Sequence, residues 1–133
     1  MKSACLFAYG TLRRDSHSPM HGYLAEHAEW LGYATFQGRM YLVDYYPGVV
    51  PSQDPADVVR GEVYRLRDAE ESLPRIDHYE ACTSGPESEY RRQTCTVCLD
   101  GGQTMEAWIY VFQQSTEGLT PIAGGDFIRF TSR

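Results

Sequence analysis

Apolar residues occur in short runs along the chain, and glycine, proline or polar residues separate the runs. The first run, residues 4–9, is almost entirely apolar and stops at Gly10, which is typical of a buried strand. Along residues 58–66, small or apolar residues alternate with larger ones such as Glu62. This alternation predicts a strand with one solvent-exposed face.

The second half of the chain contains two longer runs, residues 90–99 and 104–112, which are rich in β-branched and aromatic residues. Between them lies Asp100–Gly101, a signal typical of the turn in a β-hairpin. Residues 29–43 mix aromatic and β-branched residues with two glycines, so they predict either a pair of strands or one bent strand. The tail, residues 121–130, predicts a turn followed by a last strand.

The helical pattern is strongest in residues 68–81. Asp68 is a good N-cap residue, and two glutamates follow it in the first turn, where negative charge is favoured. Apolar residues recur there at three- and four-residue spacing, but Pro74 interrupts them, so one short helix or two shorter pieces both fit. Residues 13–22 predict a loop because they contain helix breakers, and residues 23–28 predict one short helical turn.

These elements together indicate the fold class. About six strands and one or two helices, without βαβ alternation or an internal repeat, predict an α+β protein. We expect the mostly antiparallel sheet to curl into a small barrel. The length of 133 residues suits a single domain, residues 1–133.

Charge and hydropathy narrow the classes of partner. The formal net charge is -6, which argues against nucleic acid or an anionic membrane as the main partner, because both require a basic face. No apolar run is long enough to span a membrane. The first run is also too short for the core of a secretory signal. We therefore expect a cytoplasmic protein.

Four cysteines are present, and Cys95 and Cys98 form a C-x-x-C pair. Such a pair can bind zinc or carry out redox chemistry. Here it lies in a predicted strand, where residues three apart point to opposite faces. Neither a second pair nor paired histidines supply the remaining ligands of a zinc site. We therefore expect free thiols and neither a metal nor a cofactor.

The strand end at Gly10 is the first candidate for chemistry. Because glycine lacks a side chain, a ligand can approach the backbone closely at this position. The N–H groups of Gly10, Thr11 and Leu12 could then hold a carboxylate or an oxyanion. An ordinary strand end has the same local pattern, so both interpretations stay open at this point.

Several fragments occur in a characteristic order along the chain. "YGTLRR" follows the first strand, "GEVYRL" lies in the middle, and "IDHYEA" precedes a strand that begins with "YRR". In this order and spacing the chain resembles the gamma-glutamylcyclotransferase-like superfamily, and in particular its compact members that act on gamma-glutamylamines. The resemblance covers residues 9–127, nearly the whole chain. It implies a small mixed β-barrel flanked by short helices.

The resemblance also implies which residues form the site. The loop of Tyr9, Gly10, Thr11 and Leu12 is expected to cradle the glutamyl part of the substrate through its backbone. The glutamate of the D-x-Y-E pattern, Glu80, is expected to be the catalytic acid and base. An alanine follows this glutamate where the family often has glycine, a departure that leaves the carboxylate in place.

The chemistry of the implied substrate agrees with this site. In a gamma-glutamyl compound, the α-amine can attack the γ-carbonyl of the same molecule, which yields 5-oxoproline and a free amine without an enzyme nucleophile. One group must take a proton from the α-ammonium and pass it to the leaving amine. A carboxylate at Glu80 that was desolvated beside Tyr9 would have a raised pKa, which suits this proton transfer.

Other residues allow more than one interpretation. Tyr46 and Tyr90 fit either the walls of a substrate pocket or the packing of the core. Asp77 and Asp126 are expected to be structural, and His78 is expected to lie on the surface. The alternative function is a non-catalytic module that binds a small molecule on the same barrel. The sequence leaves the amine half of the substrate and the oligomeric state open.

Overall fold

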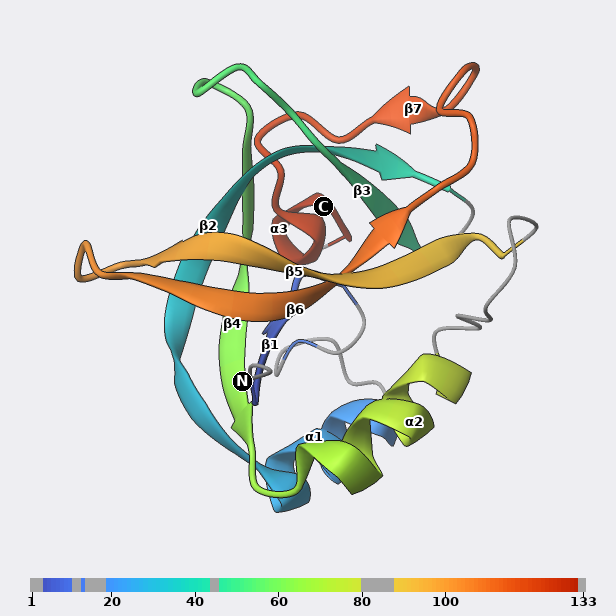
Figure 1. The fold of residues 1–133 in the computed structure, drawn as a ribbon. Coiled ribbons are helices and arrows are strands. Elements are labelled where there is room, and N and C mark those ends of the chain that lie inside the picture. Colours follow the sequence, from blue (N-terminus) through green and yellow to red (C-terminus); the bar gives the residue numbers. More distant parts are fainter. Residues whose placement is uncertain (1–3, 11–12, 14–18, 44–45, 80–87, 132–133) are drawn as a thin grey trace.

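The computed structural model describes residues 4–10, 13, 19–43, 46–79 and 88–131, and Figure 1 shows their arrangement. The elements, in chain order, are β1 (Cys5–Ala8), α1 (Pro19–His27), β2 (Ala28–Leu42), β3 (Pro47–Pro51), β4 (Val58–Leu66), α2 (Ala69–Tyr79), β5 (Tyr90–Leu99), β6 (Thr104–Phe112), β7 (Thr120–Pro121) and α3 (Phe127–Thr131). The predicted first strand and the predicted hairpin are confirmed. None of the helices in these described residues is long and apolar enough to cross a membrane.

Five strands close a mixed barrel. Their hydrogen-bonded order is β2–β4–β1–β6–β5, and β5 returns to β2 through the pairs Ala34–Leu99 and Thr35–Cys98. All neighbours in this circle are antiparallel except β1 and β6, which run parallel. Strands β3 and β7 pair with β2 outside the circle. The expected fold class, an α+β barrel that is mixed and mostly antiparallel, is confirmed.

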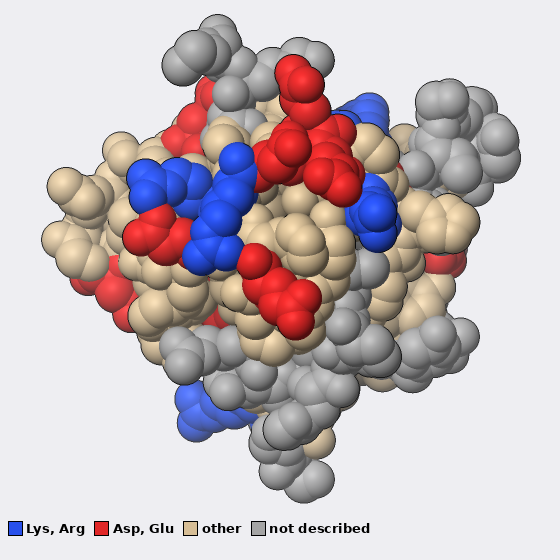
Figure 2. Space-filling view, turned by 90° about the horizontal axis from the view of Figure 1, so that it is seen from below, with Lys and Arg blue, Asp and Glu red and all other residues tan. Residues whose placement is uncertain are grey.

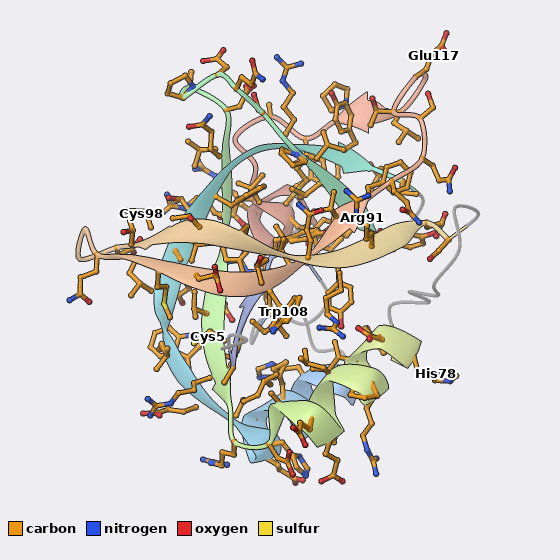
Figure 3. The ribbon with its side chains drawn as sticks, in the orientation of Figure 1. Cys5, His78, Arg91, Cys98, Trp108 and Glu117 are labelled. Carbon is orange, nitrogen blue, oxygen red and sulfur yellow. The ribbon has the colours of Figure 1, made fainter. Side chains whose placement is uncertain are left out.

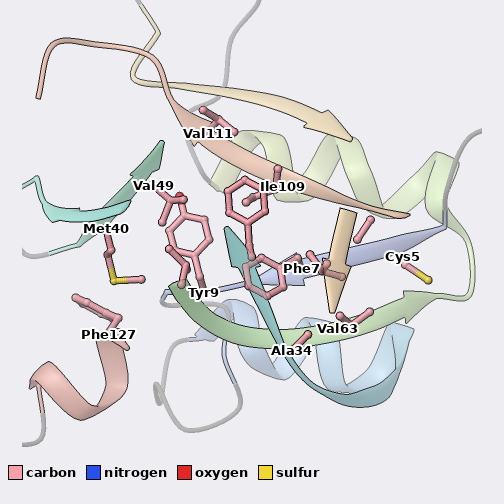
Figure 4. Close-up of a cluster of buried hydrophobic side chains, with 14 of the residues drawn as sticks. Cys5, Phe7, Tyr9, Ala34, Met40, Val49, Val63, Ile109, Val111 and Phe127 are labelled. Atoms are coloured by element: carbon pink, nitrogen blue, oxygen red, sulfur yellow. The ribbon is translucent and has the colours of Figure 1, made fainter. Parts of the chain in front are cut away.

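Two apolar clusters lie on the two sides of β1. On the inner side, Phe7 packs inside the barrel with residues such as Ile109, and Phe127 of α3 joins the same cluster (Figure 4). On the outer side, Leu6 packs with Leu24 of α1 and Ile76 of α2. Figure 1 shows α1 and α2 together beneath the barrel, so the helices cover the outer side of β1, opposite the interior cluster.

Strand β2 decides between the two alternatives for residues 29–43. It is one strand of 15 residues, so the bent strand is right and the pair of strands is wrong. The bend coincides with a shift of register against β4 between Trp30 and Gly32, where Gly32 has a φ of 145°. A bulge of this kind increases local twist, which helps a sheet curl toward closure.

Helix α1 differs from its sequence prediction, whereas helix α2 takes one of the two predicted alternatives. Helix α1 begins at Pro19, so the loop predicted for residues 13–22 is wrong from that residue on. Proline is well tolerated there because the first N–H groups of a helix have no intrahelical partner. Helix α2 is a single helix with Pro74 inside it, and the carboxylate of Asp68 accepts the N–H of Glu71 at 3.3 Å.

The strand predicted at the end of the tail is wrong. Residues 127–131 form the short helix α3 instead, and the carboxylate of Asp126 accepts the N–H of Arg129 at 3.2 Å as its N-cap. Gly124 and Gly125 precede this cap with φ values of 84° and 64°. Two successive residues of positive φ turn the chain sharply, and only glycine takes that conformation without strain.

The exposed face predicted for β4 is right at Arg60, which is exposed, and wrong farther along the strand. The residues expected on it include Glu62, which is fully buried, and Tyr64, which is 2% exposed. Tyr64 lies in the outer cluster beneath α1 and α2, and the Arg13 guanidinium lies 3.5 Å from the Glu62 carboxylate. An alternating pattern predicts two different faces, but it does not reveal that another part of the chain covers the polar one.

We expect Gly125→Ala to destabilise the fold by about 2 kcal/mol or more. An L-residue at positive φ is strained, and steric overlap of the new Cβ with the backbone of Val58 adds to the destabilisation. A Cβ at this position would lie 1.9 Å from the carbonyl oxygen of Val58, whereas one at Gly101 would meet nothing within 4 Å. Gly101→Ala is therefore the matched control, with an expected effect within about 0.5 kcal/mol. Chemical denaturation measures both, and equal stabilities for the two variants would contradict the packing described here.

Candidate active site

The end of β1 lies against the start of β3. Gly10 is buried, and a Cβ on it would lie 2.9 Å from Cγ of Pro47, so the proline ring can pack there only because the residue is glycine. The N–H of Arg13 donates to the carbonyl of Gly10 at 3.1 Å, which closes a turn over positions 10–13. Thr11 and Leu12, the middle positions of this turn, lie outside the described residues.

Tyr46 and Tyr90 lie beside the same proline. Their ring centroids are 6.3 Å apart, and the hydroxyl of Tyr90 donates to the carbonyl of Pro47 at 2.6 Å. Tyr90 is 3% exposed, so its side chain supports Pro47 from the core. Tyr46 is half-buried, and its hydroxyl donates to Glu89 at 2.6 Å. The fold thus gathers Gly10, Tyr46 and Tyr90 around one residue, although they are far apart in the sequence.

The side chain of Tyr9 points into the barrel. It belongs to the interior cluster, and its hydroxyl donates to the backbone carbonyl of Tyr110 in β6 at 2.6 Å (Figure 4). A ligand at this strand end would therefore meet the backbone of Tyr9 and not its ring. The hydrogen bond also ties the position just before Gly10 to β6, which limits how far the turn can shift.

The end of α2 is held by a second set of polar contacts. The carboxylate of Asp77 accepts hydrogen bonds from the Arg92 guanidinium at 2.8 and 3.2 Å and from the Tyr110 hydroxyl at 2.6 Å. These contacts suit the structural role expected for Asp77, which stays a prediction. Helix α2 ends at Tyr79, and Glu80 lies outside the described residues.

The neighbouring charged side chains turn outward. His78 extends from the end of α2 into solvent, as expected, and Arg91 is exposed on β5, where its guanidinium donates to Gln93 (Figure 3). Figure 2 views the face covered by α1 and α2, where acidic and basic side chains are interspersed. Arg92, the neighbour of Arg91, points to the opposite side of β5 and forms an ion pair with Asp77.

A buried ionic cluster next to the turn was missed by the sequence analysis. Arg13 is 5% exposed, and its guanidinium lies 2.8 Å from the carboxylate of Asp126 and 3.5 Å from that of Glu62. The Tyr64 hydroxyl donates to the other oxygen of Glu62 at 2.7 Å. Because Arg13 also closes the turn through its backbone, the cluster fixes the C-terminal side of the turn to β4 and to the cap of α3.

Asp126 remains ionised in this cluster. Burial alone would raise the pKa of Asp126, but the hydrogen bonds from the Arg129 N–H and the Arg13 guanidinium outweigh it and hold the pKa below its ordinary value. A depressed carboxylate pKa stabilises the folded state fully above the unfolded value, about pH 4, and this stabilisation is lost as pH falls through the lowered pKa. The anchor of the turn is therefore intact at neutral pH.

Comparisons with known proteins place this arrangement in a family. The profile described as "Gamma-glutamyl cyclotransferase, AIG2-like" matches residues 6–129. The chain belongs to this family. The "Gamma-glutamylcyclotransferase family protein YtfP" of Escherichia coli K12 is 32% identical over 124 residues, which cover 92% of this chain and 95% of that protein.

Solved structures of similar proteins share the barrel. The uncharacterized protein PH0828 of Pyrococcus horikoshii is 26% identical, with a TM-score of 0.68 over 98% of this chain and 94% of that one. An AIG2-like protein from Mus musculus is 21% identical, with a TM-score of 0.71 over 96% of this chain and 89% of that one. Both likenesses show the fold.

The C-x-x-C pair of this family member is poorly suited to hold a metal through thiolates. Cys95 is partly buried against the interior cluster, and burial raises the pKa of its thiol to about 12. A metal ligand must be the thiolate, which is scarce at neutral pH in a thiol of this kind. The thiol of Cys98 contacts the carbonyl of Leu99 at 3.6 Å.

A second hollow, a groove of about 380 Å³, lies near the C-terminal end of β2, between residues 38–41, 56–58 and 121–125. Its charged side chains are already engaged with each other. The Arg39 guanidinium donates to Asp57 at 2.7 Å, and the Ser52 hydroxyl donates to the same carboxylate oxygen at 2.6 Å. Among the described residues, Tyr9, Gly10, Tyr46 and Tyr90 do not line this groove, so we place the candidate active site at the end of β1.

Removal of the buried guanidinium in Arg13→Met should destabilise the protein by about 3 kcal/mol, because it leaves carboxylates buried without their cationic partner. Arg75→Met is the matched control. The side chain of Arg75 is 62% exposed, and its guanidinium lies 3.8 Å from Glu71 and 5.6 Å from the centre of the Tyr23 ring. Exposed contacts of both kinds have small net effects, so the expected change is within about 1 kcal/mol. Urea denaturation at pH 7 measures both, and an Arg13→Met variant as stable as the control would contradict the anchoring role.

Proposed function

We propose that the protein is a gamma-glutamyl(amine) cyclotransferase, which releases 5-oxoproline and a free amine. The family name supports chemistry of this kind, and the substrate class and the mechanism are our inference. In this proposal, the backbone of Tyr9, Gly10, Thr11 and Leu12 holds the glutamyl part of the substrate. Glu80 moves the proton.

The observation that carries the proposal is the meeting of three segments near the end of β1. The turn that begins at Gly10 packs on Pro47, the ring of Tyr46 lies beside that proline, and Tyr110 connects the strand end to the last turn of α2. In the sequence, Glu80 follows Tyr79, the last residue of α2. These contacts support a site in which a substrate could touch both the turn and the glutamate.

The proposed step balances within one molecule of substrate. The carboxylate of Glu80 takes a proton from the α-ammonium, and the freed amine attacks the γ-carbonyl to form the ring C–N bond. Backbone N–H groups of the turn stabilise the oxyanion that develops on the carbonyl oxygen. The bond to the second amine then breaks as Glu80 gives this proton to the leaving nitrogen. The ring nitrogen still carries two hydrogens, and Glu80 transfers one of them to the freed amine, so the products are 5-oxoproline, with a single lactam N–H, and an ammonium ion. Half-buried Tyr46 is proposed as a wall beside the bound glutamyl chain.

Purified protein should release 5-oxoproline from at least one donor in a panel of gamma-glutamylamines and gamma-glutamyl amino acids, since ring closure requires only positioning and proton transfer. The product can be measured by chromatography coupled to mass spectrometry, with heat-denatured protein as the blank. Binding of 5-oxoproline without turnover of any donor would contradict the enzyme and favour the non-catalytic binding module.

Glu80→Gln should lower turnover by about a hundredfold or more, the usual scale for a lost general acid–base group. The amide keeps the shape of the side chain but cannot accept a proton at neutral pH, so folding and 5-oxoproline binding should persist. Glu70→Gln is the matched control, because Glu70 lies exposed in the first turn of α2 and should tolerate the same change. Near-normal turnover in Glu80→Gln would remove Glu80 from the mechanism.

A further inference from the structure

Asp77, Arg92 and Tyr110 form a compact polar group between the last turn of α2 and strands β5 and β6. Asp77 Oδ1 accepts both Arg92 Nε at 2.8 Å and the Tyr110 hydroxyl at 2.6 Å. The second guanidinium nitrogen of Arg92 donates to Oδ2 at 3.2 Å. The guanidinium carbon also lies 4.4 Å from the centre of the Trp108 ring, so the cation is held on two sides. We call Asp77, Arg92 and Tyr110 the helix clamp.

The helix clamp acts on the last turn of α2. Pro74 lies inside α2 and removes one of its backbone hydrogen bonds. Leu73 and Ile76 anchor the middle of the helix in the outer cluster, whereas the last residues, His78 and Tyr79, are exposed. Charge-assisted hydrogen bonds from a planar guanidinium fix direction as well as distance, which suits the positioning of a terminal turn.

Tyr110 extends the helix clamp to the substrate turn. Its hydroxyl donates to Asp77, and its backbone carbonyl accepts the hydroxyl of Tyr9, each at 2.6 Å. One residue of β6 therefore touches the helix that precedes Glu80 and the strand end that precedes Gly10. Because β1 pairs with β6 in parallel, the strand end before Gly10 is held in place relative to Tyr110.

We propose that the helix clamp is a positioning device that sets Glu80 against the Tyr9–Gly10 strand end. The inference rests on the proposed function, since it needs Glu80 to be the proton carrier. In this proposal the residues of the clamp act through Glu80, so they are positioning residues and not catalytic ones. Proton transfer requires contact distance between donor and acceptor, so a small displacement of the helix end lowers turnover more than binding.

Tyr110→Phe tests the helix clamp most cleanly. It removes the hydroxyl that reaches Asp77, and it keeps the ring in the outer cluster and the backbone carbonyl that holds Tyr9. We expect kcat to fall about tenfold, less than the hundredfold that a 1 Å misplacement can cost. KM and the affinity for 5-oxoproline should stay within about twofold, because the turn keeps its own anchors.

Further variants separate positioning from general damage. Arg92→Lys should act in the same direction as Tyr110→Phe, because lysine lacks the planar fork. The matched controls are Tyr33→Phe and Arg91→Lys, whose side chains are exposed and lie outside the clamp. In a Glu80→Gln background, Tyr110→Phe should lower kcat by less than about a further twofold, because no base remains to be positioned. A full additional tenfold loss there would overturn the proposal.

Amide hydrogen exchange tests the helix clamp without turnover. In Tyr110→Phe, exchange at residues 77–79 should rise by about fivefold, the effect of one lost hydrogen bond, while Leu73 should change little. Unchanged exchange at the helix end would overturn the clamp even if the enzyme is active. A wild type that turns over no donor would overturn the proposed function, and the positioning role with it. The two failures are therefore distinguishable.

Discussion

The pairing of β1 on both sides is the constraint on which the rest of the molecule depends. This strand has only four residues, all buried, and it lies antiparallel to β4 and parallel to β6. Without it the circle of five strands has no link between β4 and β6. The inner and outer clusters also meet on it, because Phe7 faces the interior and Leu6 faces the helices. The strand that closes the barrel thus fixes where its own end, Gly10, must lie.

The candidate site follows from this closure. The residues on both sides of the turn are attached to the strands beside β1. Tyr9 bonds to β6, and Arg13 pairs with Glu62 of β4 and also with Asp126, the cap of α3. A reaction in which the substrate supplies its own nucleophile demands mainly a fixed geometry from the protein. Rigid strands supply geometry more reliably than loops, so a short turn held from both sides suits the proposed chemistry.

The sequence predicted the elements that depend on local pattern. The apolar run before Gly10, the hairpin at Asp100–Gly101 and the cap at Asp68 each express a local physical preference. Other fragments, such as "YGTLRR" and "IDHYEA", supported the family resemblance, which also implied the barrel. Gly10, Tyr46 and Tyr90 were named from different parts of the chain, and the fold brings them together at Pro47.

What escaped prediction depends on contacts between distant segments. Glu62 looked exposed because alternation gives no sign of the arginine, 49 positions earlier, that covers it. The closing pairs between β2 and β5 leave no local trace, and α3 is too short for a periodic pattern. One local signal was available: Asp126 after two glycines is a recognisable N-cap, which pointed to a helix where we predicted a strand.

The central claim is that a ligand oxygen binds at the end of β1. A titration of ¹⁵N-labelled protein with 5-oxoproline, followed through the backbone amide resonances, tests this claim directly. The account predicts that the largest shifts belong to Gly10 and its neighbours Tyr9 and Arg13, while Arg39 and Gly124 of the separate groove change little. Shifts concentrated at the groove, with the resonance of Gly10 unmoved, would contradict it.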